Sequence, residues 1–209
     1  MENNIFCFWT GENNMSQNRK KSLKLLPIQT ECKITFVTPD NLHTYIKKDN
    51  PLHPAYDYLS EVHKSDYLRI YFMKFYGGGY HDIKQATGSW VDSFSSLKKS
   101  DKQIMGFAEG KYGPNKFFRR HWKKLIGTSA FICKKDSMIT NDWYSKVVSL
   151  LDKKHEKLKK HPSMNPRDKT KEYPLFWSEL LGNIFHEVLL SYPDQILNSL
   201  PRPVCKDYL

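Results

Sequence analysis

The chain has 209 residues, a formal net charge of +11, and a composition that is 39% hydrophobic and 14% aromatic. This length fits one domain, and the apolar content excludes an intrinsically disordered chain. No run of about 18 apolar residues occurs and the N-terminus lacks a signal-peptide pattern, so we expect neither a membrane span nor secretion.

The N-terminal part alternates predicted strands and helices. Residues 5–9 form a short apolar run typical of a buried strand, and residues 33–37 form a second one. Between them, Ser16 is suited to cap a helix that reaches about Leu26, with Pro27 beyond its end. Strand–helix–strand units at this spacing predict an α/β fold with a mostly parallel sheet, whose ligands bind at the carboxyl ends of the strands.

Residues 60–84 combine an apolar helix, a glycine break and a cluster of charges. Apolar side chains recur at helical spacing in this stretch, and Gly77–Gly79 then favour a break because glycine enters left-handed conformations cheaply. The extended run that follows carries Asp82 and Lys84 to the predicted rim of a cleft. Asp66 and Arg69 lie three residues apart on the helix, either as an exposed ion pair or as two groups that point into this cleft.

The C-terminal part predicts two more strands, at residues 103–108 and 125–133, and a helix over residues 141–160. The small polar residues Thr128 and Ser129 interrupt the second of these strands, which often marks a close approach by a ligand or by backbone.

Residues 161–173 predict a loop that could act as a lid or acceptor-binding flap, and Pro174 is suited to open a final helix. Glu179 and His186 lie off the apolar stripe of this helix, separated by about 10.5 Å of helix rise, so they cannot both bind one metal ion directly. The plain interpretation of Glu179 is a solvated carboxylate at a helix start, and that of His186 is a polar tip at a helix edge.

The positive charge gathers around Trp122, at Arg119, Arg120, Lys123 and Lys124, and in the stretch 153–171. A basic surface can bind nucleic acid or attract a diphosphate substrate, whereas the plain interpretation of the second cluster is a solvated helix face. Four widely spaced cysteines without a C-x-x-C pair favour reduced thiols and a cytoplasmic location.

The pattern S-D-x-L-R, an aromatic helix and then G-G-x-Y-x-D resembles the donor-site signature of GT-A glycosyltransferases of the DXD and capsular-polysaccharide type. The matching residues are Ser65, Asp66, Leu68, Arg69, Gly77, Gly78, Tyr80 and Asp82. The resemblance implies a single Rossmann-like GT-A domain over residues 1–209, in which residues 1–84 hold the nucleotide-sugar and residues 85–209 form the acceptor half with the C-terminal helix.

The resemblance also implies roles for single residues. Asp66 and Arg69 would hold the donor, with Gly78, Gly79 and Tyr80 beside it and Thr128 and Ser129 behind the sugar. Trp9, followed by Thr10 and Gly11, would pack against the nucleotide base, although half-buried packing is the alternative for this tryptophan. Arg19 would reach a phosphate, or else be an ordinary surface arginine.

Asp82 would begin a D-x-D motif that binds Mn²⁺ or Mg²⁺, but the second aspartate is replaced by Lys84. Water, phosphate oxygens or a distant His or Glu, with His186 as the candidate, would complete the metal shell. Alternatively, Lys84 itself lies against the diphosphate, which predicts weaker metal dependence. Glu179 is the second candidate catalytic residue beside Asp82.

The resemblance thus implies a metal-assisted, retaining transfer of a hexose from a UDP-sugar to a glycan or glycoprotein acceptor, and we expect no nucleic-acid partner. The chain could be one domain of a larger viral or bacterial glycan-building protein, in the host cytoplasm if viral. The alternatives are a non-catalytic basic module that binds nucleic acid or an acidic polymer, and a degenerate transferase that binds donor without turnover.

Overall fold

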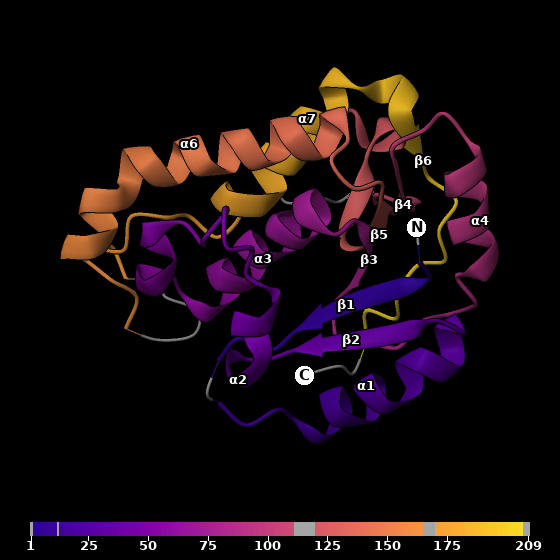
Figure 1. The fold of residues 1–209 in the computed structure, drawn as a ribbon, viewed down its shortest axis with the longest axis horizontal. Helices are drawn as coiled ribbons and strands as arrows, with labels where there is room; N and C mark the ends of the chain where they lie inside the picture. Colours follow the sequence, from indigo (N-terminus) through magenta and orange to yellow (C-terminus); the bar gives the residue numbers. More distant parts are fainter. Residues whose placement is uncertain (1, 12, 111–119, 165–169, 207–209) are drawn as a thin grey trace.

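The computed structural model describes residues 2–11, 13–110, 120–164 and 170–206. Its described strands form one sheet in the order β2-β1-β3-β5-β4-β6 (Figure 1). The strand bounds are β1 Asn4–Phe8, β2 Lys33–Val37, β3 Gly78–His81, β4 Ile104–Ala108, β5 Ile126–Cys133 and β6 Ile196–Leu197. Only β5 runs antiparallel to its neighbours among these strands, so the predicted α/β domain with a mostly parallel sheet is confirmed.

Helices cover both faces of the sheet (Figure 1). They are α1 Gln17–Thr30, α2 Pro39–Leu42, α3 Glu61–Phe75, α4 Val91–Lys99, α6 Met138–Lys160 and α7 Ile184–Ser191. A π-helical turn, Glu179–Asn183, leads into α7, and short 3₁₀ turns lie at His43–Tyr45, Pro54–Tyr58, Trp122–Lys124 and Pro193–Gln195. Within the described residues, no helix is both long and apolar enough to span a bilayer.

The alternation of side chains along β1 divides the core between the two faces. Phe6 and Phe8 pack with the apolar residues of α3, α6 and α7, whereas Ile5 and Cys7 join the clusters on the face that α1 and α4 cover. Neighbouring residues of a strand point to opposite faces, so both sides of the sheet are buried by one short apolar run.

Helix α3 begins and ends where the sequence predicts. Ser60 caps it by accepting a hydrogen bond from the His63 N–H at 3.3 Å. Gly77 follows its end with φ +67° and donates to the Phe72 carbonyl at 3.1 Å. A Cβ at Gly77 would lie 2.7 Å from the Lys135 nitrogen, so the site requires glycine for its conformation and for its space.

The predicted end of the first helix is wrong, because α1 continues through Pro27 to Thr30. The last turn is held by contacts outside the helix: the Thr30 carbonyl accepts from the Trp90 N–H at 2.9 Å, and Gln29 Oε1 accepts from the Ala86 N–H at 2.9 Å. These bonds compensate for the hydrogen bond that a proline cannot donate.

The bounds of two C-terminal helices also differ from prediction. Helix α6 begins at Met138 rather than residue 141, since Ser137 and Thr140 form a reciprocal cap. The final helix does not open at Pro174; the helical backbone starts at Glu179, with the Asn183 N–H bonded to the Ser178 carbonyl at 2.8 Å.

Candidate active site

A cavity of about 410 Å³ opens at the carboxyl ends of the parallel strands β1 and β3, beside the N-terminal half of α3. This is where a doubly wound sheet is expected to bind its ligand. The lining residues are Phe8, Trp9, Thr10, Gly11, Asn13, Asn14, Ser16 and Arg19 from β1 to α1; Glu61, Val62, Ser65 and Arg69 from α3; Tyr80, Asp82, Ile83 and Lys84 from β3 and its extension; and Trp177.

Asp82 is the centre of a hydrogen-bonded ion network on the wall of this cavity. Its Oδ1 accepts from the Tyr80 hydroxyl at 2.6 Å and lies 3.3 Å from Arg69 Nη2, while its Oδ2 lies 2.9 Å from Lys84 Nζ. The side chain of Asp82 is 21% exposed, against 12% for Arg69 and 10% for Lys84. The carboxylate is therefore the most accessible part of a largely desolvated cluster.

The strand alternation explains how this network forms. Tyr80 and Asp82 are two residues apart and so point to the face of the sheet that α3 covers. The Asp82 N–H donates to the Ser129 carbonyl at 2.7 Å, which continues the pairing of β3 with β5. The Arg69 guanidinium then lies 4.5 Å from the centre of the Tyr80 ring and meets Asp82 from α3.

The charges around Asp82 fix its ionisation. Burial alone would raise the pKa of Asp82, but Arg69, Lys84 and the Tyr80 hydroxyl lower it to about 2. Burial raises the pKa of Asp66 to about 7, a shift that Arg69 opposes and Asp82 reinforces. Of the two carboxyls near Arg69, Asp82 is thus the stable anion near neutral pH.

Asp66 and Arg69 are not an exposed ion pair, because Asp66 is 5% exposed and lies 3.4 Å from Arg69 Nη2. Arg69 lines the cavity and also donates to the Thr128 carbonyl at 3.2 Å, whereas Asp66 is not among the lining residues. The structure therefore brings Arg69 to the cleft and keeps Asp66 beside it as a buried partner.

The loop after β1 brings Trp9, Thr10 and Gly11 to the cavity, and the first turn of α1 brings Arg19. Trp9 is half-buried; its indole N–H donates to the Asn13 carbonyl at 2.9 Å, and the Arg19 guanidinium lies 5.7 Å from the ring centre. Arg19 also donates to the Ile83 carbonyl at 3.4 Å, so it links α1 to the turn that follows β3.

Five predicted substrate-binding residues do not line the cavity: Asp66, Gly78, Gly79, Thr128 and Ser129. A Cβ at Gly78 would lie 2.9 Å from the Asn4 carbonyl oxygen, and one at Gly79 would meet Ile5 at 3.0 Å. The two glycines thus allow close strand packing.

Glu179 and His186 also lie outside the cavity lining. Glu179 is held by Lys154 at 2.7 Å and accepts from the Phe176 N–H at 3.0 Å. His186 is buried, with Nε2 3.2 Å from the Ile126 carbonyl oxygen and 3.6 Å from Glu109 Oε2, and burial lowers its pKa. Both side chains have structural partners in the C-terminal half.

The donor set of the cavity does not fit a divalent metal ion as the side chains are arranged. No group of three or more His, Cys, Asp or Glu residues comes together to hold a metal within the part of the chain that the structure describes. Both oxygens of Asp82 already have partners, and two of the partners, Arg69 and Lys84, are cations. Mn²⁺ and Mg²⁺ take about six oxygen ligands, which one neutralised carboxylate does not provide.

Several lining residues were not predicted as site residues from the sequence, and Glu61 and Trp177 are the most informative of them. Glu61 lies at the start of α3, with Oε1 3.2 Å from Lys64 Nζ and a buried Oε2 that has no hydrogen-bond partner in the described structure. Trp177 is 56% exposed at the cavity. The loop predicted as a flap includes residues 165–169, which lie outside the described residues; Tyr173, at its end, is buried.

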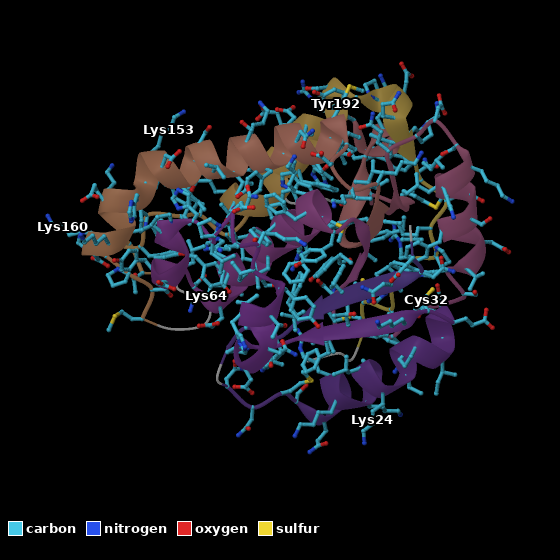
Figure 2. All side chains as sticks on the ribbon, viewed as in Figure 1. Lys24, Cys32, Lys64, Lys153, Lys160 and Tyr192 are labelled. Atoms are coloured by element: carbon cyan, nitrogen blue, oxygen red, sulfur yellow. The ribbon has the colours of Figure 1, made fainter. Side chains whose placement is uncertain are left out.

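The second basic cluster behaves as a solvated helix face in its described part. Lys153 and Lys160 are exposed on α6 (Figure 2). Lys157 is exposed as well, whereas Leu158 is buried. In the first cluster, Arg119 lies outside the described residues, and Arg120, Lys123 and Lys124 are exposed.

Comparison with known proteins places this geometry in context. A comparison with curated protein sequences finds no significant match. Among solved structures, the chain is similar to "PaToxG Glycosyltransferase", with 15% identity, a TM-score of 0.50, and coverage of 91% of this chain and 69% of the other. The family model "Capsular polysaccharide synthesis protein" matches residues 1–161, a range that contains the lining residues except Trp177. The chain therefore belongs to the capsular polysaccharide synthesis protein family, and its domain has the fold of a glycosyltransferase.

Proposed function

We propose that this glycosyltransferase moves a hexose from a nucleoside diphosphate sugar, with UDP as the nucleotide, to a hydroxyl group of a glycan or glycoprotein. The observation that carries the proposal is the Asp82 network with Arg69 and Lys84, set in the wall of a cavity at the strand ends. Such a cavity has a suitable size for a nucleotide-sugar, and its cations suit a diphosphate.

The loop after β1 forms the nucleotide end of the proposed site. Trp9 offers an aromatic surface for the base, with Phe8 next to it in the lining. Stacking of a base on an aromatic ring contributes about 1–3 kcal/mol. Arg19, close to the Trp9 ring, is placed for the phosphates between the base and the Asp82 network.

The sugar end lies toward α3 and the acceptor end toward Trp177. Ser65 and Glu61 offer a hydroxyl and a carboxylate oxygen to donor hydroxyls, and the buried Glu61 Oε2 lacks a protein donor in the described structure. The exposed ring of Trp177 provides an apolar face on which an acceptor can pack. We assign the acceptor to this side of the cavity.

Two further parts of the proposal concern stereochemistry and location. We expect retention of the anomeric configuration, on the resemblance of the donor-site motif to GT-A transferases. We expect a cytoplasmic location, which is supported by the four cysteines that remain free thiols.

A thermal-shift series with UDP, UDP-glucose, UDP-galactose, UDP-N-acetylglucosamine and GDP-mannose tests the proposal. A ligand that binds the native state raises the free energy of unfolding, by about 2.7 kcal/mol at a ligand concentration of 100 times Kd, and so raises the melting temperature. A shift with one or more donors, lost in Arg69→Ala, supports the donor site. Release of free sugar with the same donor separates an active transferase from a degenerate one.

The rival function, a basic module for nucleic acid, predicts a different outcome. It would show oligonucleotide binding that weakens steeply with salt and no stabilisation by any nucleotide-sugar. The exposed lysines of α6 would then carry the binding, so Lys153→Ala with Lys157→Ala would weaken it. That pair of results would replace the transferase proposal.

A further inference from the structure

The misfit between the Asp82 network and a divalent metal has a chemical consequence for the proposed reaction. Glycosyl transfer leaves a diphosphate whose negative charge must be stabilised as the bond to the sugar breaks. A metal ion on carboxylate ligands is one solution, but here Lys84 occupies the place of the second carboxylate. The following inference rests on the proposed function and concerns what replaces the metal.

Lys84 is held as a built part of the site. Its N–H donates to the Asp82 carbonyl at 2.6 Å, which bends the chain tightly between the two residues. Ile83, at the middle of the bend, is 2% exposed and packs in the cluster that contains Cys7 and Leu26. The bend thus returns Lys84 Nζ to within 2.9 Å of Asp82 Oδ2, with the lysine side chain 10% exposed.

Burying an ammonium group is costly unless the ion is paired. Asp82 supplies that pairing, and it also lies 3.3 Å from Arg69 Nη2, so one carboxylate holds two cations. Arg19 adds a third cation to the cavity lining, against the two acidic lining residues Glu61 and Asp82. With Glu61 bound to Lys64, the wall near Asp82 keeps excess positive charge for an anion.

We propose that Lys84, positioned by Asp82 and assisted by Arg69 and Arg19, takes the place of the divalent cation, so that donor binding and transfer proceed without metal. In this step the bond between the sugar C1 and the β-phosphate oxygen breaks, and its electron pair stays on the diphosphate. The acceptor oxygen forms the new bond to C1, and the acceptor proton passes to the departing phosphate oxygen. Lys84 donates hydrogen bonds to that oxygen as its charge develops.

Calorimetric titration of UDP, GDP and dTDP into the protein, with EDTA or with Mn²⁺, tests this inference without requiring turnover. The wild type should bind its nucleotide with the same Kd in both buffers, within about twofold. Lys84→Ala should weaken binding about 10- to 100-fold, because a charged hydrogen bond is lost, and Lys84→Arg should retain most of the affinity. Lys153→Ala, which changes an exposed lysine of α6, is the matched control and should leave Kd unchanged.

Lys84→Asp provides a second, independent variant because it recreates the D-x-D pattern. Its nucleotide affinity should be low in EDTA and recover at least in part with Mn²⁺, which would show that the lysine and the metal are interchangeable at this place. Melting temperatures without ligand show whether each variant is folded, and hydrolysis of the sugar donor with and without EDTA checks the chemical step.

The outcomes separate the inference from the proposed function. Binding by the wild type that requires Mn²⁺, or a folded Lys84→Ala variant with unchanged Kd, overturns the inference and leaves the transferase proposal in place. Failure of the folded wild type to bind any of the three nucleotides in either buffer overturns both.

Discussion

At the residue scale, Trp177 and Phe176 form a natural pair for testing the acceptor side of the site. Both rings are exposed, at 56% and 79%, but only Trp177 lines the cavity. We expect Trp177→Ala to raise the KM for acceptor about tenfold, the loss of roughly 1.4 kcal/mol of ring contact, while donor hydrolysis stays within about twofold. Steady-state transfer and hydrolysis assays measure the two effects.

Phe176→Ala is the control for this change, because it removes a neighbouring exposed ring outside the cavity. Its acceptor KM should equal that of the wild type. An equal rise in both variants would indicate that the segment as a whole has been disturbed, and an unchanged Trp177→Ala variant would remove the tryptophan from the acceptor site.

Gly79 allows a test between packing and substrate binding. A Cβ there would meet Ile5 at 3.0 Å, Trp90 at 3.1 Å and Phe94 at 3.2 Å, on the face of the sheet away from the cavity. We expect Gly79→Ala to lower the free energy of unfolding by about 1–3 kcal/mol through overpacking, with nucleotide Kd unchanged in the folded fraction. Urea unfolding and calorimetry provide the two measurements.

Gly88→Ala is the matched substitution, since the nearest atom to its Cβ would be 3.8 Å away, in Pro201. It should change stability by less than about 0.5 kcal/mol. A Gly79→Ala variant of wild-type stability but weaker nucleotide binding would restore the predicted role of this glycine as a donor-site residue.

The sequence predicts much of the site because its chemistry is local. Asp82 and Lys84 lie in one short segment after a glycine break, and Arg69 lies on the preceding helix, so one motif contains all three. Trp177 could not be predicted in the same way: its position depends on how the chain between α6 and α7 packs on α3, a long-range contact without a sequence period. Glu61 could not be singled out either, because the helix dipole already explains an acidic residue in the first turn of a helix.

At the element scale, helix α3 is tied to the segment that carries Trp177. The Tyr173 hydroxyl accepts from the Ser60 N–H at 3.1 Å and lies 2.8 Å from His63 Nδ1, and His63 Nε2 lies 3.3 Å from the Phe176 carbonyl oxygen. These bonds hold residues 173–176, which belong to no helix or strand, against the start of α3, and this explains why no helix begins at Pro174.

Tyr173→Phe should therefore lower stability by about 1–3 kcal/mol, because it leaves the buried Ser60 N–H without its partner and removes one of the hydrogen bonds of the His63 ring. It should also weaken acceptor use more than donor hydrolysis, since the Trp177 segment loses its anchor. The half-buried Tyr58, whose hydroxyl has no hydrogen bond in the described structure, supplies the control Tyr58→Phe. Equal stability losses in the two variants would contradict the anchoring role.

The elements themselves show where sequence reasoning succeeds. Strands β1, β2, β4 and β5 and helix α3 follow from short apolar runs, caps and glycines, all of which are local signals. The continuation of α1 through Pro27 and the π turn at Glu179–Asn183 do not, because each depends on hydrogen bonds and packing from distant parts of the chain. Local propensity decides an element only where tertiary contacts agree with it.

At the scale of the whole molecule, the buried ionisable groups predict how stability responds to acid. Burial lowers the pKa of His63, His81 and His186, that of His81 to about 4. As the pH falls below about 6.5, the unfolded chain binds protons that these three rings refuse in the folded state, and His81 refuses its proton until about pH 4. Their contribution to stability is complete above pH 6.5 and is lost as the pH falls.

Asp66 acts in the opposite direction, because its pKa is raised to about 7 and the folded chain keeps a proton that the unfolded chain releases above about pH 3.8. Each proton is worth about 1.4 kcal/mol per pH unit, and three groups act against one, so the free energy of unfolding should fall on acidification from pH 6.5 to 5. Urea midpoints at closely spaced pH values measure the slope. His63→Gln should reduce it, because the substitution removes one of the buried rings that refuse a proton in the folded state. A stability that rises on acidification through this range would contradict the prediction, because the proton that Asp66 keeps would then outweigh those that the histidines refuse.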